Sequence, residues 1–252
     1  MTIDRPLPRQ IPQLRSLWKE AFGDTDAFLD IFFHRAFSRD RSRCITCDGS
    51  VTAALYWFDC TWQGKRLAYL YAVATAKDRQ GQGLCRKLME DTHRQLKKLG
   101  YDGCILAPQA GGLFAMYEKF GYRTCSHIRE FSCAAGSDAI ALTEATPAEY
   151  AAARRRLLPE NGVLQEGATL DFLQTYARLY TGENLTLAAY PDGDKLVVCE
   201  LLGDPEKAPQ ILSALGFREG SFRTPGHDRP YTMFLPLTED PAMPDYFGLI
   251  MD

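Results

Sequence analysis

The sequence has little of what marks several specialised classes of protein. Four histidines occur among 252 residues, and 29 basic and 32 acidic side chains leave a formal net charge of −3. This near balance of charge argues against a general nucleic-acid binder. The longest apolar stretches, such as residues 67–76, are far shorter than the ~20 residues that cross a bilayer. The first residues hold no apolar signal core, so we expect a cytoplasmic protein with neither a membrane nor a nucleic-acid partner.

Cysteine pairs with the spacing of a metal or redox site are scarce too. Cys44 and Cys47 form the only C-x-x-C among eight cysteines. A structural zinc site needs a second pair of ligands, and none follows at a suitable spacing. A thioredoxin-like pair opens a helix, whereas this one lies in an expected strand. The other cysteines are scattered among apolar neighbours, so we expect free thiols in a reducing compartment and no bound metal.

The composition is that of a folded globular protein. Hydrophobic residues make up 46% and charged residues 24%, close to the average for such proteins. A length of 252 residues suits one large domain or two small ones. A run of small and polar residues at 134–138 marks the expected junction. We therefore predict one domain at residues 1–135 and a smaller α/β domain at 136–252, which walls the site or mediates dimerisation.

Hydrophobic periodicity predicts a mixed α/β order in the first domain. Two helices are expected within residues 12–37, and the later helices at 84–99 and 111–120. The expected strands are 44–47, 51–61, 67–75, 103–107 and 122–133.

The second domain has a similar but sparser pattern. Helices are expected at 147–158, 169–180 and 205–215, a hairpin through 191–193 and a strand at 231–237. The phrase Leu215-Gly216-Phe217 echoes Phe120-Gly121-Tyr122. Two explanations stay open for this echo, namely a degenerate duplication and a common way for helices to end.

A glycine-punctuated turn joins the strand at 67–75 to the helix at 84–99. It reads Gln80-Gly81-Gln82-Gly83-Leu84-Cys85, and its glycines let the backbone turn sharply while several N–H groups point outward at the start of the helix. Such a nest suits a phosphate or pyrophosphate. Residues 77–98 hold seven basic and three acidic side chains, a local charge of +4. A plain tight turn also explains the pattern, because Arg86 stands where a complete G-x-G-x-x-G has its third glycine.

A second motif follows in the short helix expected at 111–120. Residues 113–122 read Leu-Phe-Ala-Met-Tyr-Glu-Lys-Phe-Gly-Tyr. Together the two motifs resemble the Gcn5-related N-acetyltransferase (GNAT) superfamily, whose pyrophosphate loop reads Gln/Arg-x-x-Gly-x-Gly/Ala and whose later helix ends in a phrase like Phe-Tyr-Glu-Lys-Leu-Gly-Phe. Gln80, Gly83 and Cys85 occupy the three defining positions of the loop, with Cys85 in place of Gly or Ala. The opening helices, with their Leu-Trp-x-x-Ala-Phe core, are similar to those of such a domain.

The resemblance implies a bacterial-type GNAT fold, a mixed central sheet flanked by helices, followed by an extra C-terminal domain that could be a degenerate GNAT-like half. It also implies acetyl-CoA as co-substrate. A splayed strand would pair with the pantetheine arm, loop amides would hold the pyrophosphate, and a phenol of pKa ~10 would protonate the departing thiolate as general acid. The residues that take these roles are Val73, Ala74 and Thr75 for pantetheine, Gln80, Gly81, Gln82, Gly83, Leu84, Cys85 and Arg86 for the pyrophosphate, and Tyr117 for the acid. An asparagine often found before that tyrosine is replaced by Ala110.

The resemblance thus implies direct transfer of acetyl from acetyl-CoA to a primary amine in a ternary complex, by a monomer or a homodimer. The acceptor stays open between a small amine, an aminoglycoside-like molecule and a peptide amine, and Asp24, Asp26 and Asp30 are candidates to line its pocket. The general base is open as well. The chain end is apolar and is expected to dock, and Asp252 could carry the terminal carboxylate into the site, as in some multidomain members of the superfamily.

Three alternatives remain at this stage. One is an acyl or aminoacyl transferase with another donor, since a fold does not fix the group transferred. Another is a non-catalytic CoA-binding or interaction module. The third is a mechanism with a cysteine nucleophile, for which Cys85 and Cys104 flank the expected site without an evident histidine partner.

Overall fold

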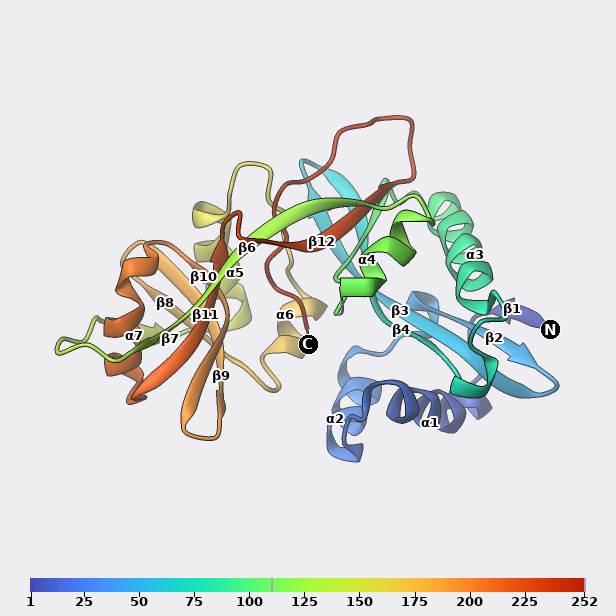
Figure 1. Ribbon diagram of the computed structural model, residues 1–252, viewed down its shortest axis with the longest axis horizontal. Helices are drawn as coiled ribbons and strands as arrows, with labels where there is room; N and C mark the ends of the chain where they lie inside the picture. Colours follow the sequence, from blue (N-terminus) through green and yellow to red (C-terminus); the bar gives the residue numbers. More distant parts are fainter. Residues whose placement is uncertain (110, 252) are drawn as a thin grey trace.

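The computed structural model describes residues 1–109 and 111–251, and the first half follows the expected α/β order (Figure 1). Its strands are β1 (Thr2–Asp4), β2 (Ser42–Cys47), β3 (Ser50–Trp62), β4 (Lys65–Thr75), β5 (Gly103–Leu106) and β6 (Arg123–Ala134). Its helices are α1 (Ile11–Phe22), α2 (Asp26–Ile31) with a π-helical extension at Phe32–Ala36, α3 (Leu84–Lys98) and α4 (Gly111–Glu118). Short 3₁₀ turns lie at Pro8–Gln10, Arg39–Arg41 and Lys77–Arg79.

The second half departs from its predicted pattern at one helix, and it contains three strands that were not predicted, at residues 142–144, 178–182 and 219–225. Its strands are β7 (Leu142–Glu144), β8 (Arg178–Gly182), β9 (Leu185–Asp192), β10 (Lys195–Leu202), β11 (Glu219–Pro225) and β12 (Arg229–Pro236), and its helices are α5 (Pro147–Leu157), α6 (Ala168–Leu173) and α7 (Ala208–Leu215), the last preceded by a 3₁₀ turn at Pro205–Lys207. The helix predicted at 169–180 is wrong beyond Leu173, where the chain turns and continues as β8. That strand pairs with β7 and β9, so tertiary pairing overrides the local periodicity.

Twelve strands of the described chain form one mixed sheet. Their order is β1-β2-β3-β4-β5-β12-β6-β11-β10-β9-β8-β7. Each half contributes the same succession, a strand, two helices, three strands, a helix and a strand. In each half the last two of these strands are parallel neighbours, β4 with β5 and β10 with β11, whereas the other neighbours are antiparallel. The repeated order supports the duplication over a mere common helix ending.

The two halves exchange strands at the centre of the sheet. β12 of the second half lies between β5 and β6, so Cys104 is opposite Leu235 and Ser126 is opposite Thr232. Reciprocally, β6 of the first half lies between β12 and β11. The boundary predicted between residues 135 and 136 follows the end of β6 at Ala134, and the sheet runs continuously across it.

The first-half sheet is covered on both faces. Buried residues of α1, α2 and α6 pack with Tyr56, Phe58 and Tyr69 on one face. Residues of α3 and α4 pack with the alternate strand residues, among them Trp57 and Leu70, on the other face. Because side chains alternate along a strand, two separate cores result. Within the described chain, no helix is long and apolar enough to cross a membrane.

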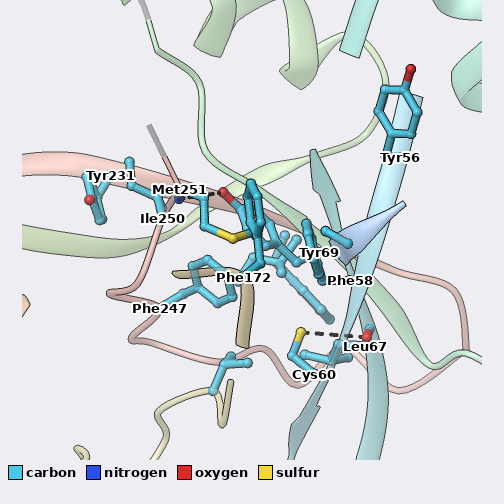
Figure 2. Packing of buried hydrophobic residues seen from close by; sticks show 14 of the residues in the cluster. Tyr56, Phe58, Cys60, Leu67, Tyr69, Phe172, Tyr231, Phe247, Ile250 and Met251 are labelled. Carbon is cyan, nitrogen blue, oxygen red and sulfur yellow. Dashed lines mark hydrogen bonds between the residues drawn. The ribbon is translucent and has the colours of Figure 1, made fainter. Parts of the chain in front are cut away.

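The chain end belongs to the first of these cores. Phe247, Ile250 and Met251 lie beside Tyr69 and Phe172, and each of the three is buried (Figure 2). The side-chain amide of Gln165 donates to the Leu249 carbonyl, and the Leu249 N–H donates back to the Gln165 side-chain oxygen over 3.2 Å. The expectation that the apolar tail docks is therefore met for its residues up to 251.

Candidate active site

The central feature of the site is a splay between β4 and β5. The two strands pair only through Leu67–Tyr69 of β4. Past that point β4 carries a bulge against β3, with Ala72 at a φ of +49°. No strand in the described ranges pairs with Val73, Ala74 or Thr75 on the β5 side. This edge of β4 therefore carries backbone groups without a strand partner, while the Thr75 carbonyl accepts a hydrogen bond from the Gln80 side chain.

A cavity of about 610 Å³ opens at the splay. It connects the two faces of the sheet, because it touches Tyr117 and Leu113 of α4 as well as Trp18 and Phe28 of α1 and α2. Its described lining residues are Trp18, Ala21, Phe22, Asp24, Phe28, Tyr69, Leu70, Tyr71, Ala72, Val73, Leu106, Ala107, Pro108, Gln109, Leu113, Tyr117, Tyr176, Tyr190, Ile250 and Met251.

The loop after β4 presents free amides at the start of α3. Gly81 and Gly83 have φ values of +74° and +76°, and Gly83 is the N-cap residue. A side chain at either glycine would meet open space, so the left-handed backbone and not crowding requires glycine there. The N–H groups of Leu84, Cys85 and Arg86 begin the helix and have no acceptor within it. Such a turn can hold a pyrophosphate.

Two glutamines and an arginine shape this loop. The Gln80 side-chain amide donates to the Thr75 carbonyl over 3.3 Å, and Gln82 donates in the same way to Asp78 over 3.2 Å. The Arg86 guanidinium donates to the Lys119 carbonyl over 3.4 Å and lies 4.7 Å from the centre of the Phe120 ring. The loop is therefore tied to the end of β4 and to the end of α4, which sequence reasoning did not foresee.

Tyr117 lies in the last turn of α4 and, with Leu113 of the same helix, lines the cavity. Its side chain is 7% exposed and packs 5.8 Å from Tyr122, ring centre to ring centre. Burial raises the pKa of the Tyr117 hydroxyl well above its usual range. The phenol carries its proton at neutral pH with or without this shift, and the raised pKa makes that proton harder to donate.

The thiols near the site are poor nucleophiles. Burial raises the pKa of the Cys85 thiol to about 11, and it raises the pKa of the fully buried Cys104 thiol further still. The His93 ring is hydrogen-bonded to the Tyr122 hydroxyl over 2.8 Å, and burial lowers the pKa of His93 to about 4. Since thiolates and not thiols attack, this environment disfavours the cysteine mechanism.

The three aspartates predicted as candidates for the acceptor pocket lie in different places. Asp24 lines the cavity, and its carboxylate accepts a hydrogen bond of 2.6 Å from the Trp18 indole. Asp26 and Asp30 lie on the exposed surface, where they pair with Lys19 at 2.9 Å and Arg15 at 2.7 Å. Only one of the three is placed to meet a ligand in the cavity.

The second half supplies part of the cavity wall, which sequence reasoning missed. Tyr176, Tyr190, Ile250 and Met251 all line it. The Met251 N–H donates to the Tyr69 hydroxyl over 3.3 Å (Figure 2). The apolar character of the tail was the available signal for its share. Ala110 and Asp252 lie outside the described residues.

The corresponding place in the second half is closed. There α7 begins Ala208-Pro209, and proline has no N–H to offer an anion. β10 carries its own irregularity between Val198 and Glu200. Glu200 is fully buried and paired with Arg154, and Gly248 of the tail packs against the Glu200 carboxylate.

Comparison with known proteins agrees with this geometry. Residues 3–125 match the model of the acetyltransferase (GNAT) domain. These residues form a GNAT acetyltransferase domain. No curated protein matches the chain in sequence.

Solved structures share the GNAT fold over both halves. A GCN5-related N-acetyltransferase from Kribbella flavida superposes with a TM-score of 0.70 at 17% identity, covering 92% of this chain and 70% of its own. One from Anabaena variabilis gives 0.72 at 14% identity, with coverages of 94% and 73%. Eis1 from Mycobacterium abscessus gives 0.69 at 13% identity, with coverages of 94% and 74%. The whole chain, and not the first half alone, therefore has the architecture of these proteins.

Proposed function

We propose that this GNAT protein transfers an acetyl group from acetyl-CoA to a primary amine in a ternary complex. The observation that carries the proposal is the cavity that crosses the sheet at the β4–β5 splay. A thioester entering beside α3 and α4 and an amine entering beside α1 and α2 would meet in that opening. Bringing two substrates together in this way is itself a large part of catalysis.

The donor is supported by the loop and the splayed strand together. The amides of residues 81–86 would take the pyrophosphate, with Gln80 holding the loop, and the backbone of Val73, Ala74 and Thr75 would pair with the pantetheine arm. The loop follows β4 directly in the chain, and the 3.3 Å hydrogen bond from the Gln80 side chain to the Thr75 carbonyl holds it against the end of that strand. The thioester would then lie where Val73 and Tyr117 face the cavity.

The proposed chemistry needs no covalent enzyme intermediate. The neutral amine nitrogen attacks the thioester carbonyl carbon, so that a C–N bond forms and the C–S bond breaks. The sulfur leaves as a thiolate and takes the proton of the Tyr117 hydroxyl. The proton lost by the nitrogen returns to the phenolate through solvent, which restores the enzyme and balances the reaction.

Calorimetry with acetyl-CoA, followed by thiol release with a panel of amines, tests the proposal. We expect acetyl-CoA binding and amine-dependent release of CoA thiol. Absence of acetyl-CoA binding refutes the proposal. Binding without release on any amine favours a non-catalytic CoA-binding module, and release only with other acyl-CoA donors favours a transferase with another donor.

The role of Tyr117 is tested by Tyr117→Phe. Loss of a general acid lowers kcat by about 10²-fold or more, while the Kd for acetyl-CoA stays nearly constant because the ring is retained. Tyr122→Phe is the matched control, since Tyr122 is buried beside Tyr117 and bonded to His93 but does not line the cavity. An unchanged kcat in Tyr117→Phe removes the acid role.

A further inference from the structure

Aromatic rings form the wall of the cavity on the side where the acceptor would enter, and this wall limits the kind of amine that fits. Assuming the transferase activity proposed above, we propose that the acceptor amine is carried on an aromatic or bulky apolar group. The group would lie against the rings contributed by α1, α2, β4 and the second half, with the amine nitrogen pointing to the splay.

The wall is a continuous run of aromatic rings. The Trp18 ring centre lies 5.5 Å from Tyr71 and 6.3 Å from Phe28. Phe28 lies 6.2 Å from Tyr176, which lies 6.4 Å from Tyr190. All five rings line the cavity. The wall thus extends from the first half to the second as a series of neighbouring rings, with Asp24 beside Trp18.

Such rings contribute to binding in two ways. Burying an apolar group against them is favourable by roughly 25 cal/mol for each Å² removed from water. Their faces also attract cations, most strongly the face of an indole. A ligand with both an apolar body and an amine uses both contributions, whereas a body covered with hydroxyl groups would lose hydration against the ring faces.

The charge in the wall has one sign. Asp24 is the only charged side chain among the described residues that line the cavity. Its carboxylate is fixed beside the indole by the 2.6 Å hydrogen bond from Trp18. A single fixed negative charge next to an indole favours a cationic ligand over a neutral or anionic one. One such charge suits a monoamine better than a polycationic aminoglycoside.

Thiol release by the full-length protein with three amines at saturating acetyl-CoA tests the proposal. The probes are 2-phenylethylamine, propylamine and kanamycin. We expect kcat/KM to be at least about tenfold higher for 2-phenylethylamine than for propylamine, which corresponds to ~1.4 kcal/mol of ring contact. A preference for kanamycin or propylamine overturns the acceptor class while leaving the transferase activity standing.

Variants separate the ring contribution from the charge contribution. Phe28→Ala, which removes a half-buried ring, should lower kcat/KM for 2-phenylethylamine several-fold more than it lowers kcat/KM for propylamine. Asp24→Asn keeps an oxygen to accept from Trp18 and should raise KM for both amines. Asp30→Asn is its matched control, because Asp30 lies on the outside of the same helix pair. Equal effects of Asp24→Asn and Asp30→Asn contradict the charge argument.

Calorimetry with the CoA-bound protein keeps the two proposals distinguishable if no amine releases thiol. Tighter binding of 2-phenylethylamine than of propylamine and kanamycin would then support the aromatic wall as a ligand site, although the transferase proposal fails. The same affinity for all three amines, or no binding of any, overturns the acceptor class.

Discussion

Gly83 and Gly100 offer a matched pair of substitutions at the two ends of α3. Gly83 precedes the helix with a φ of +76°, and Gly100 follows it with a φ of +78°. A Cβ at either position would meet no atom within 4 Å. Changing either glycine to alanine therefore tests only the left-handed backbone, at a cost of about 1–2 kcal/mol.

The consequence for the ligand differs between the two ends. If the loop relieves the strain of Gly83→Ala by leaving the left-handed conformation, the amides of Leu84, Cys85 and Arg86 no longer converge. An acetyl-CoA molecule held by those amides must then restore the strained loop when it binds. A cost of ~1.4 kcal/mol is tenfold in affinity, so we expect the Kd for acetyl-CoA to rise about tenfold. The same strain at Gly100 lies a helix length away from the loop and leaves the Kd unchanged.

Isothermal titration calorimetry measures the two Kd values, and urea unfolding measures the two losses of stability. Gly83→Ala should lose less free energy of unfolding than Gly100→Ala, because its loop relieves the strain that acetyl-CoA binding must then restore. An unchanged Kd in Gly83→Ala, at a stability loss smaller than that of Gly100→Ala, would refute the assignment of this loop to the pyrophosphate.

Two further predictions concern the tail and a buried histidine. Tyr246→Phe removes the 2.9 Å hydrogen bond that the Tyr246 hydroxyl donates to Glu200. Because a hydrogen bond to a charged group contributes about 1.5–3 kcal/mol, we expect the free energy of unfolding in urea to fall by that amount and kcat/KM for the amine to fall as well. Tyr150→Phe, whose hydroxyl lies 3.4 Å from Glu200, should lose less stability, and the opposite ranking would contradict the assigned hydrogen bonds to Glu200. Burial lowers the pKa of His93 from 6.5 to about 4, so only the unfolded chain takes up this proton between those values. The free energy of unfolding should therefore fall as the pH drops from 6.5 towards 4, by up to ~1.4 kcal/mol per pH unit. Urea unfolding at pH 7 and pH 5 measures this loss of stability, which should be smaller in His93→Gln than in the unaltered protein. An equal loss in the variant and the unaltered protein would exclude His93 as its source.

Most helices and strands of the first half could be predicted from the sequence because they depend on local sequence patterns. The helix predicted at 84–99 is Leu84–Lys98, with its glycines at the predicted ends. The strand that leads into it follows from an apolar run rich in Tyr, Leu and Val, and the loop follows from Gly81 and Gly83. These features depend on neighbours in the sequence, so periodicity and turn chemistry suffice to predict them.

The second half was less readable because its structure depends on distant partners. β8 takes a segment predicted as helix, since β7 and β9 supply its hydrogen bonds. Tyr176 and Tyr190 reach the cavity only through the way the halves pack. No local pattern announces that kind of contact, and the same holds for the aromatic wall as a unit.

The exchange of β6 and β12 has a consequence for the order in which the protein can fold during synthesis. β5 and β6 leave the ribosome well before β12, which lies between them in the finished sheet. Until Arg229–Pro236 emerges, these two strands present unpaired facing edges, a state that invites association with other chains. The tail that contributes Ile250 and Met251 to the cavity is made later still. The nascent first half therefore cannot enclose its cavity until nearly the whole chain has been translated.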